Sequence, residues 1–185
     1  MEAELHAREA AFSGKPGGEG STATEAGVTR LPFAVLADNI RSMWNVGSIF
    51  RTADACGVER LVLAGITGTP PQRSITKVSL GAEHALRWEY RAQALAALDS
   101  LRVDGYTPVA LETGDAGVPL DRFDWPVRPC LVVGHEVRGI SPEVFDAVER
   151  HVFIPMSGVK DSFNVAVAFG IAAHHASAQL RGRNP

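Results

Sequence analysis

Two polar residues, Ser162 and Asn164, stand at the start of a long apolar stretch that runs from 163 to 176. Its apolar residues fall on almost every helical face, which predicts a helix over 163–176 with Ser162 as its N-cap. The first backbone N–H groups of a helix have no intrahelical partner, and they can bind polar or anionic groups of a ligand. The stretch therefore predicts a small-molecule or catalytic site at this helix start.

The same helix also predicts an assembly. A helix that is apolar all round is buried on all sides. A chain of 185 residues can achieve this by packing one side in its own domain and the other side against a partner. Because two-fold pairing is the commonest arrangement of soluble oligomers, we expect a homodimer.

Short apolar runs alternate with helical patterns from residue 31 onward. Strands are predicted at 33–37, 60–64, 87–90, 108–111, 129–133 and 152–155, and helices at 46–56, 92–102, 142–150 and 163–176. Gly57 follows the first helix as a C′ residue, and Ser141 with Pro142 begins the third as N-cap and N1. The alternation predicts an α/β fold with a mostly parallel sheet and helices on both faces.

Parallel sheets bind ligands beyond the carboxyl ends of their strands. The loops expected there are 38–46, 111–117, 134–141 and 155–162. The phosphate-binding patterns G-x-G-x-x-G and G-x-x-x-x-G-K-[ST] are missing, and so is the G-x-S-x-G nucleophile elbow. His135-Glu136 does not continue into H-E-x-x-H, and no metal site is expected. These patterns alone predict an α/β domain with a site at the strand ends.

Composition places the chain among ordinary globular proteins, with 45% apolar and 21% charged residues. A formal net charge of −3 argues against a sequence-independent polycation. Cys56 and Cys130 lack metal-ligand spacing and are expected to be reduced core residues. We expect a cytoplasmic protein with no membrane partner, since no signal peptide or spanning run is present. Residues 1–30 predict a flexible Gly-rich tail, and residues 31–185 one domain.

Three segments resemble the motifs of the SpoU-type RNA 2′-O-ribose methyltransferases of the SPOUT superfamily. They are NIRSMWNVGSIFRTADACGV (39–58), LVVGHEVRGIS (131–141) and IPMSGVKDSFNVAVA (154–168). TKVSLGAEH (76–84) is similar to the family's connecting stretch. The resemblance covers about residue 33 to the end, and three long motifs in the right order make it specific. The motif positions of the family's catalytic site fall on Asn45, Arg51, Glu136, Ser162 and Asn164.

The resemblance implies a fold and a cofactor that composition cannot reveal. In such proteins the C-terminal segment threads through an earlier loop and forms a deep trefoil knot, which is very rare. The loops after the later strands would wrap S-adenosylmethionine in a bent conformation. The cofactor contacts, largely from backbone, would come from Leu111, Gly134, Ile154 and Phe163. Family members usually carry Leu at the position of Phe163.

The implied reaction is methyl transfer from S-adenosylmethionine to a ribose 2′-hydroxyl of a structured RNA, either tRNA or rRNA. DNA lacks this hydroxyl and is not an expected partner. By resemblance, Arg51 contacts the hydroxyl and Ser162 anchors the cofactor loop. Asn45, Glu136 and Asn164 would hold the Arg51 loop and the substrate. Neutralising a guanidinium of ordinary pKa, above ~12, costs roughly 7 kcal/mol at pH 7, so positioning is the larger role expected of Arg51.

The same residues have plainer interpretations without the motifs. Arg51 alone would be a solvated arginine, Asn45 and Ser162 would be caps, and Glu136 would be an exposed loop carboxylate. The alternative function is a catalytically weak, RNA- or cofactor-binding knot protein. The presence of Arg51, Glu136, Ser162 and Asn164 argues against it, and the acidic balance argues mildly for it, because RNA affinity grows with the number of phosphates neutralised. Candidates for phosphate contact at the rim of the site are Arg41, Arg73, Lys77, Arg138 and Lys160.

Overall fold

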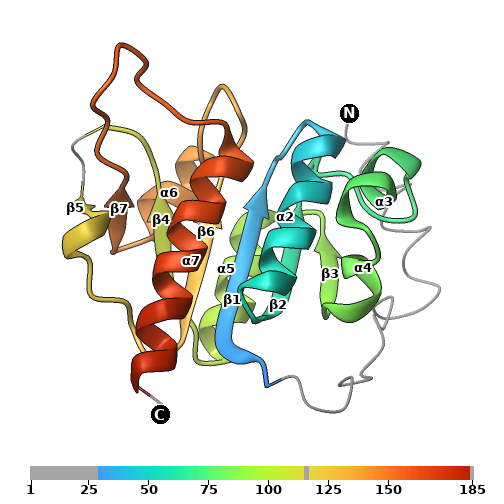
Figure 1. Cartoon of the computed structure of the whole chain (residues 1–185), viewed down its shortest axis with the longest axis horizontal. Coiled ribbons are helices and arrows are strands. Elements are labelled where there is room, and N and C mark those ends of the chain that lie inside the picture. The colour runs from blue at the N-terminus through green and yellow to red at the C-terminus, as the bar shows by residue number, and fades with distance from the viewer. Residues whose placement is uncertain (1–28, 115–116, 184–185) are drawn as a thin grey trace.

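Seven parallel strands form the sheet within the part of the chain that the computed structural model describes, residues 29–114 and 117–183. Their order is β3-β2-β1-β6-β4-β7-β5 (Figure 1). The strands are β1 (Leu31–Asp38), β2 (Val58–Ala64), β3 (Trp88–Arg91), β4 (Thr107–Leu111), β5 (Val118–Pro119), β6 (Pro129–Val133) and β7 (His151–Phe153). The predicted parallel sheet is confirmed, and the short edge strand β5, which follows the predicted loop 111–117, is an addition.

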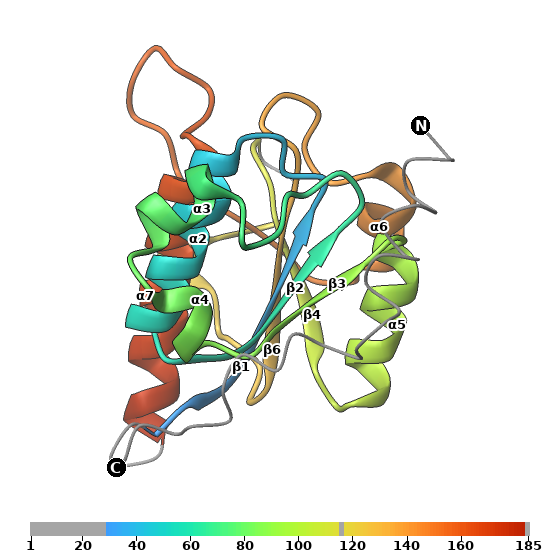
Figure 2. The ribbon, with the colours of Figure 1, turned by 90° about the vertical axis from the view of Figure 1, so that its right-hand side faces the viewer.

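Helices cover both faces of this sheet, as predicted. The helices are α2 (Met43–Ala55), α3 (Arg73–Ser79), α4 (Ala82–Ala85), α5 (Ala94–Val103), α6 (Pro142–Ala147) and α7 (Val165–Arg183), with a 3₁₀ turn at Leu120–Arg122. Figure 2 shows α2, α3, α4 and α7 on one face and α5 and α6 on the other.

The strand β1 explains why both faces need a cover. Its side chains alternate, because successive residues of a strand point to opposite faces. Phe33, Val35 and Ala37 belong to the core beneath α2 and α7, whereas Ala34 and Leu36 belong to the core beneath α5 and α6. All five are fully buried. A continuous apolar run is therefore what a central parallel strand requires.

The start of α7 differs from the prediction. The helix begins at Val165, and its cap is Asn164, whose Oδ1 accepts the backbone N–H of Ala166 at 2.9 Å and of Val167 at 3.4 Å. Ser162 as N-cap is therefore wrong. Asparagine caps a helix as well as serine does, so residue type alone could not choose between the two positions.

The end of α7 also differs, since the helix continues to Arg183 instead of ending at 176. Its last turns are held by tertiary contacts. Gln179 Nε2 donates to the carbonyl of Phe123 at 2.8 Å, and Arg183 donates to the carbonyl of Trp125. Leu180 is buried in the core. These contacts extend a helix whose local sequence has already turned polar.

The helix α6 is shorter than predicted and ends at Ala147. Val148 is already extended, with φ −93° and ψ 125°, and its side chain is buried. Ser141 occupies the predicted N-cap position, but its side chain makes no capping hydrogen bond. Gly57 has φ +72°, so its predicted C′ role is confirmed.

One side of α7 is covered by its own chain. Phe169, Ala172 and Ala176 are fully buried against the sheet, whereas Val167 is 50% and Ile171 38% exposed. The prediction that a single domain buries only part of this helix is consistent with that division. The homodimer itself stays a prediction.

Residues 1–28 of the predicted tail lie outside the described residues. Arg30 already belongs to the folded structure, because its Nη2 lies 2.6 Å from Asp54 Oδ1 and donates to the carbonyl of Ala85 at 3.0 Å. Across 29–114 and 117–183, no helix combines the length and apolarity that crossing a membrane requires. The same ranges hold no group of three or more His, Cys, Asp or Glu side chains placed to bind a metal ion.

Two glycines provide a matched test of helix packing. A Cβ at Gly47 in α2 would lie 2.7 Å from the carbonyl oxygen of Ile75 and 2.8 Å from Val78 Cβ, whereas a Cβ at Gly170 in α7 would lie 3.6 Å from Thr52. Gly47→Ala should therefore lower the free energy of unfolding by about 1–2 kcal/mol. Gly170→Ala should raise it by up to about 1 kcal/mol through helix propensity. Urea unfolding measures both, and shifts of the same sign would contradict the packing described.

Candidate active site

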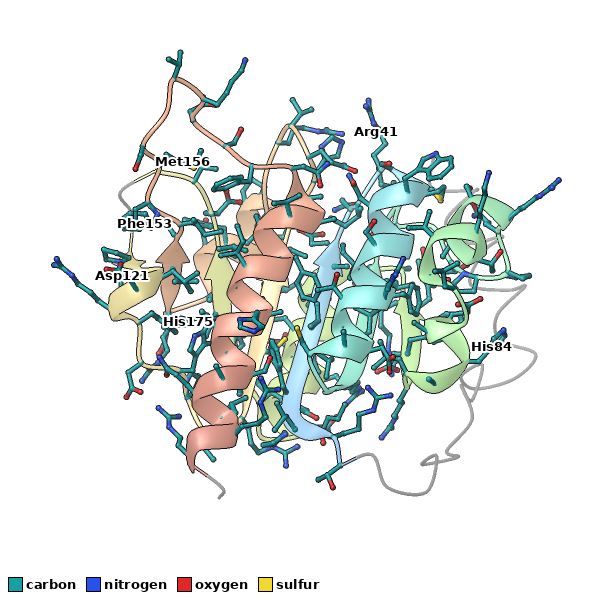
Figure 3. All side chains as sticks on the ribbon, in the orientation of Figure 1. Arg41, His84, Asp121, Phe153, Met156 and His175 are labelled. Atoms are coloured by element: carbon teal, nitrogen blue, oxygen red, sulfur yellow. The ribbon has the colours of Figure 1, made fainter. Side chains whose placement is uncertain are left out.

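A pocket of about 240 Å³ lies at the carboxyl ends of β4, β6 and β7. Three predicted loops line it, through residues 111–114, 134–139 and 154–163. Met156, labelled in Figure 3, lies on the loop that follows β7 and belongs to the lining. The predicted cofactor residues also line this pocket: Leu111, Gly134, Ile154 and Phe163. Their contact with a cofactor stays a prediction.

The pocket wall is partly apolar and partly polar. Val133, Val165 and Ala168 contribute apolar surface, and Glu112 and Asp161 contribute carboxylates. An apolar wall with a few placed polar groups is typical of small-molecule sites.

The loop after β6 folds back on itself. The backbone N–H of His135 donates to the carbonyl of Gly139 at 2.9 Å, and the N–H of Gly139 donates back at 2.8 Å. A Cβ at Gly134 would lie 2.2 Å from backbone atoms of Gly139 and Ile140. Glycine at 134 is therefore required by the close return of its own loop. His135 is buried, and its Nδ1 accepts the N–H of Val137 at 3.0 Å, so it supports the loop.

Two carboxylates that sequence reasoning missed hold this loop against the sheet. Asp38, fully buried at the end of β1, accepts the N–H of Ser141 through Oδ2 at 2.7 Å. Glu112, directly after β4, accepts the N–H of Ile140 through Oε1 at 2.6 Å. The sequence signal that could have identified them is an acidic residue at the end of a predicted buried strand. At that position a carboxylate can accept backbone N–H groups of a neighbouring loop.

Glu136 joins two loops that lie far apart in the sequence. Its Oε2 accepts the backbone N–H of Arg41 at 3.0 Å. Its Oε1 accepts the N–H of Ser42 and the side-chain amide of Asn45, both at 2.8 Å. Partial burial by itself would raise the pKa of the Glu136 carboxyl, but these donors outweigh it and lower the pKa below its ordinary value.

The hydrogen bonds continue from Glu136 to α7. Asn164 Nδ2 donates to Asn45 Oδ1 at 3.1 Å, and the other side of the Asn164 amide caps α7. Three of the predicted site residues therefore form one chain, Glu136–Asn45–Asn164, which connects the loop after β6, the start of α2 and the start of α7.

The remaining two predicted residues are placed differently. Ser162 lines the pocket, is exposed, and donates through Oγ to Asp161 at 3.3 Å.

Arg51 is exposed on α2 and does not line the pocket. It forms no hydrogen bond or ion pair with any residue that the structure describes. Six residues after Asn45, it lies roughly 9 Å further along the helix axis. Within a single polypeptide, Arg51 therefore lies outside the pocket.

Replacing Glu136 by Gln tests the junction of the two loops. Gln turns an amide NH₂ toward backbone donors and leaves at least one of them without an acceptor. Because the site is partly open to solvent, we expect a loss of about 1 kcal/mol of stability at pH 7. The folded-state pKa lies below the ordinary 4.5, so the contribution is complete above that value. It is lost as the pH falls through the folded-state pKa.

Urea unfolding at several pH values measures this. Wild type and Glu136→Gln should differ at neutral pH and converge in acid. Glu149→Gln is the control, because Glu149 is exposed and is a partner in no hydrogen bond within the described ranges. If the free energies of unfolding of wild type and Glu136→Gln differed by the same amount at every pH, the charge of Glu136 would not be what stabilises the junction.

Residues 32–174 match the model of the SpoU rRNA Methylase family. The chain is 30% identical over 145 residues to the tRNA (guanosine(18)-2′-O)-methyltransferase of Aquifex aeolicus, covering 78% of this chain and 68% of that protein. It is 28% identical over 153 residues to a 23S rRNA (guanosine-2′-O-)-methyltransferase of Shewanella oneidensis, covering 83% and 62%.

A solved structure gives the same result. The AdoMet-bound rRNA methyltransferase from Sinorhizobium meliloti superposes with a TM-score of 0.74 at 26% identity, covering 89% of this chain and 58% of that one. The chain thus spans between 58% and 68% of the lengths of these three proteins. The resemblance drawn from the three motifs is confirmed, and the chain belongs to the SpoU rRNA methylase family.

Proposed function

We propose that this protein transfers a methyl group from S-adenosylmethionine to a ribose 2′-hydroxyl of tRNA or rRNA. The observation that carries the proposal is the convergence of the three family motifs on one pocket and on the Glu136–Asn45–Asn164 chain beside it. The relatives named above are 2′-O-methyltransferases of tRNA and rRNA. The target nucleoside is left open, because those two relatives act on different RNAs.

The pocket residues fit S-adenosylmethionine. Apolar side chains such as Leu111 and Ile154 suit an adenine ring. The carboxylates of Glu112 and Asp161 complement the positive sulfonium and ammonium groups. Gly134 and its neighbours offer backbone groups without a covering side chain. The cofactor, when bound, supplies an electrophilic methyl group on sulfur, and its departure leaves a neutral thioether.

The chain's own residues align the acceptor oxygen. Glu136 and Asn45 fix the start of α2, and Asn164 fixes the start of α7, so the two helices keep a set spacing at the pocket edge. Ser162, which lines the pocket, anchors the cofactor loop, as the family resemblance implies. Arg51, a permanent cation with a planar fork of donors, orients the 2′-oxygen and its neighbouring phosphate. Correct alignment of reacting atoms supplies a large part of such a rate enhancement.

A second copy of the chain completes the site in this proposal. Arg51 is exposed and outside the pocket of its own chain, and the outer side of α7 exposes Val167 and Ile171. A two-fold dimer that covers α7 brings Arg51 of one subunit to the pocket of the other. The protein then acts as a cytoplasmic homodimer on RNA.

The trefoil knot belongs to the same proposal. The chain leaves β7 inside the sheet, passes along the pocket through residues 154–164, and returns as α7 beside α2 and β1 (Figure 1). This path supports threading of α7 past the loops that follow β4 and β6. Pulling the chain by its two ends would test it, because a knotted chain stays shorter than its full contour length.

The alternative, a binding protein without catalysis, is separated from the enzyme by direct assay. The full chain is incubated with radiolabelled S-adenosylmethionine and total RNA from cells that lack the gene. Nucleoside mass spectrometry then identifies the product. A 2′-O-methylated nucleoside is the expected result, whereas binding of both cofactor and RNA with no transfer would support the alternative.

Arg51→Ala should remove the chemical step and leave the fold. Because the side chain is exposed and unpaired within the described structure, the loss of stability should stay within about 0.5 kcal/mol. Methyl transfer at saturating cofactor should fall on the order of a hundredfold or more. Arg51→Lys should not restore it, because an ammonium lacks the planar fork. Single-turnover transfer measures the rate, and a near-normal rate in Arg51→Ala would exclude Arg51 from the reaction.

Mixed dimers test whether Arg51 acts across the interface. Gly134→Val should abolish cofactor binding, because its side chain collides with Gly139 and Ile140. Each variant alone should be inactive. Co-expression with Arg51→Ala should restore about a quarter of the wild-type activity, since half of randomly paired dimers carry one complete site of two. Light scattering checks the dimer mass of each variant. Restoration would not occur if Arg51 served the pocket of its own chain.

A further inference from the structure

Trp44 is an exposed aromatic side chain beside the site. It lies in the first turn of α2 and is 56% exposed, whereas the other two tryptophans, Trp88 and Trp125, are 8% and 1% exposed. Its neighbour Met43 packs against the core, and the Sδ of Met43 lies where a side chain at Gly68 would be. Met43 therefore anchors the turn and leaves the indole of Trp44 at the surface.

One cation lies over this indole, and two exposed arginines lie close in the sequence to Trp44 or to Lys77. Lys77 Nζ lies over the ring at 5.9 Å from its centroid. Arg73 precedes Lys77 by one turn of α3 and is also exposed. Arg41 is exposed three residues before Trp44 and extends outward from the end of the sheet in Figure 3. The first turns of α2 and α3 contain no acidic residue. The surface formed by Arg41, Trp44, Arg73 and Lys77, here called the Trp44 surface, is therefore aromatic and positively charged.

Hydrogen bonds join the Trp44 surface to the pocket. Glu136 lines the pocket and accepts the backbone N–H of Arg41 and the side chain of Asn45. Trp44 lies between these two residues in the sequence. The turn that carries the indole is therefore held directly beside the pocket.

We propose that Trp44 stacks on an unpaired base flanking the methylated nucleotide, with Lys77, Arg73 and Arg41 contacting its phosphates. This inference rests on the proposed function and names how the RNA is held. An exposed indole with nearby cations fits single-stranded RNA, because unstacked bases bind aromatic faces and phosphates bind cations. The Trp44 surface thus selects RNA in which the target lies in a loop.

A second copy of the chain fits this surface less well. Three cations repeated on both sides of a two-fold axis would repel each other. The outer side of α7, with Val167 and Ile171, offers an apolar patch without that cost. The charges therefore favour RNA over a subunit interface.

Tryptophan fluorescence of the full chain tests the proposal, because Trp44 is the most exposed of the three tryptophans. The probes are unfractionated tRNA and a short single-stranded oligoadenylate. Both should quench the emission of the wild type and not that of Trp44→Phe. Trp44→Ala should weaken oligoadenylate binding about five- to a hundredfold, which corresponds to the loss of one stacked base. Trp44→Phe should restore most of the affinity.

Further measurements separate stacking from a structural role. Trp44→Ala should raise the RNA KM and leave both cofactor affinity and dimer mass unchanged. Lys77→Ala should reduce the slope of log K against log salt by about one. Val127→Ala is the control, because Val127 is 72% exposed but precedes the central strand β6, at the amino ends of the strands and away from the pocket, and it should bind RNA as the wild type does.

The outcomes are distinct. Wild-type affinity in Trp44→Ala would overturn the proposal, and so would conversion of that variant to a monomer, which would place Trp44 in a subunit interface. If the wild type methylates RNA and Trp44→Ala does so with the same KM for RNA, the stacking proposal is refuted and the proposed function stands. Failure of the wild type itself to transfer methyl groups refutes the proposed function.

Discussion

One carboxylate, that of Glu136, determines how the loops at the site are arranged. It accepts N–H groups from Arg41 and Ser42 and the amide of Asn45, and Asn45 in turn accepts from Asn164. Without this acceptor the backbone between β1 and α2 would present donors with no protein partner. The charge of Glu136 makes these bonds stronger than neutral ones, and the starts of α2 and α7 are set relative to the pocket through them.

The same principle operates at two neighbouring strand ends. Asp38 and Glu112 each accept a backbone N–H of the segment 140–141, so the loop that walls the pocket is held by carboxylates from β1 and β4. An irregular loop satisfies only some of its backbone groups by itself, and the remaining N–H groups need side-chain or water partners. Acidic side chains at the carboxyl ends of parallel strands accept those N–H groups here, and one of the two, Glu112, also lines the pocket.

A single chain leaves three features of the site open to solvent. Arg51 has no partner within the described ranges, the outer side of α7 exposes Val167 and Ile171, and Trp44 presents its indole beneath the Lys77 ammonium. In the two proposals made above, the apolar surface of α7 binds a second subunit and the Trp44 surface binds RNA. The two partners would therefore occupy different parts of the molecule.

The sequence by itself determined every described strand except β5, the helices α2, α5, α6 and α7, and the loops that line the pocket, because burial in a parallel sheet leaves a local apolar pattern such as that of β1. It did not predict the short helices α3 and α4. The three motifs also identified Glu136, Asn45 and Asn164. Only the tertiary structure decided that Asn164 caps α7 in place of Ser162, that Asp38 and Glu112 hold the loop after β6, and that Trp44 is exposed. The reason is distance along the chain. The bonds from Ser42 to Glu136 and from Ser141 to Asp38 join residues 94 and 103 positions apart, and no local pattern records them.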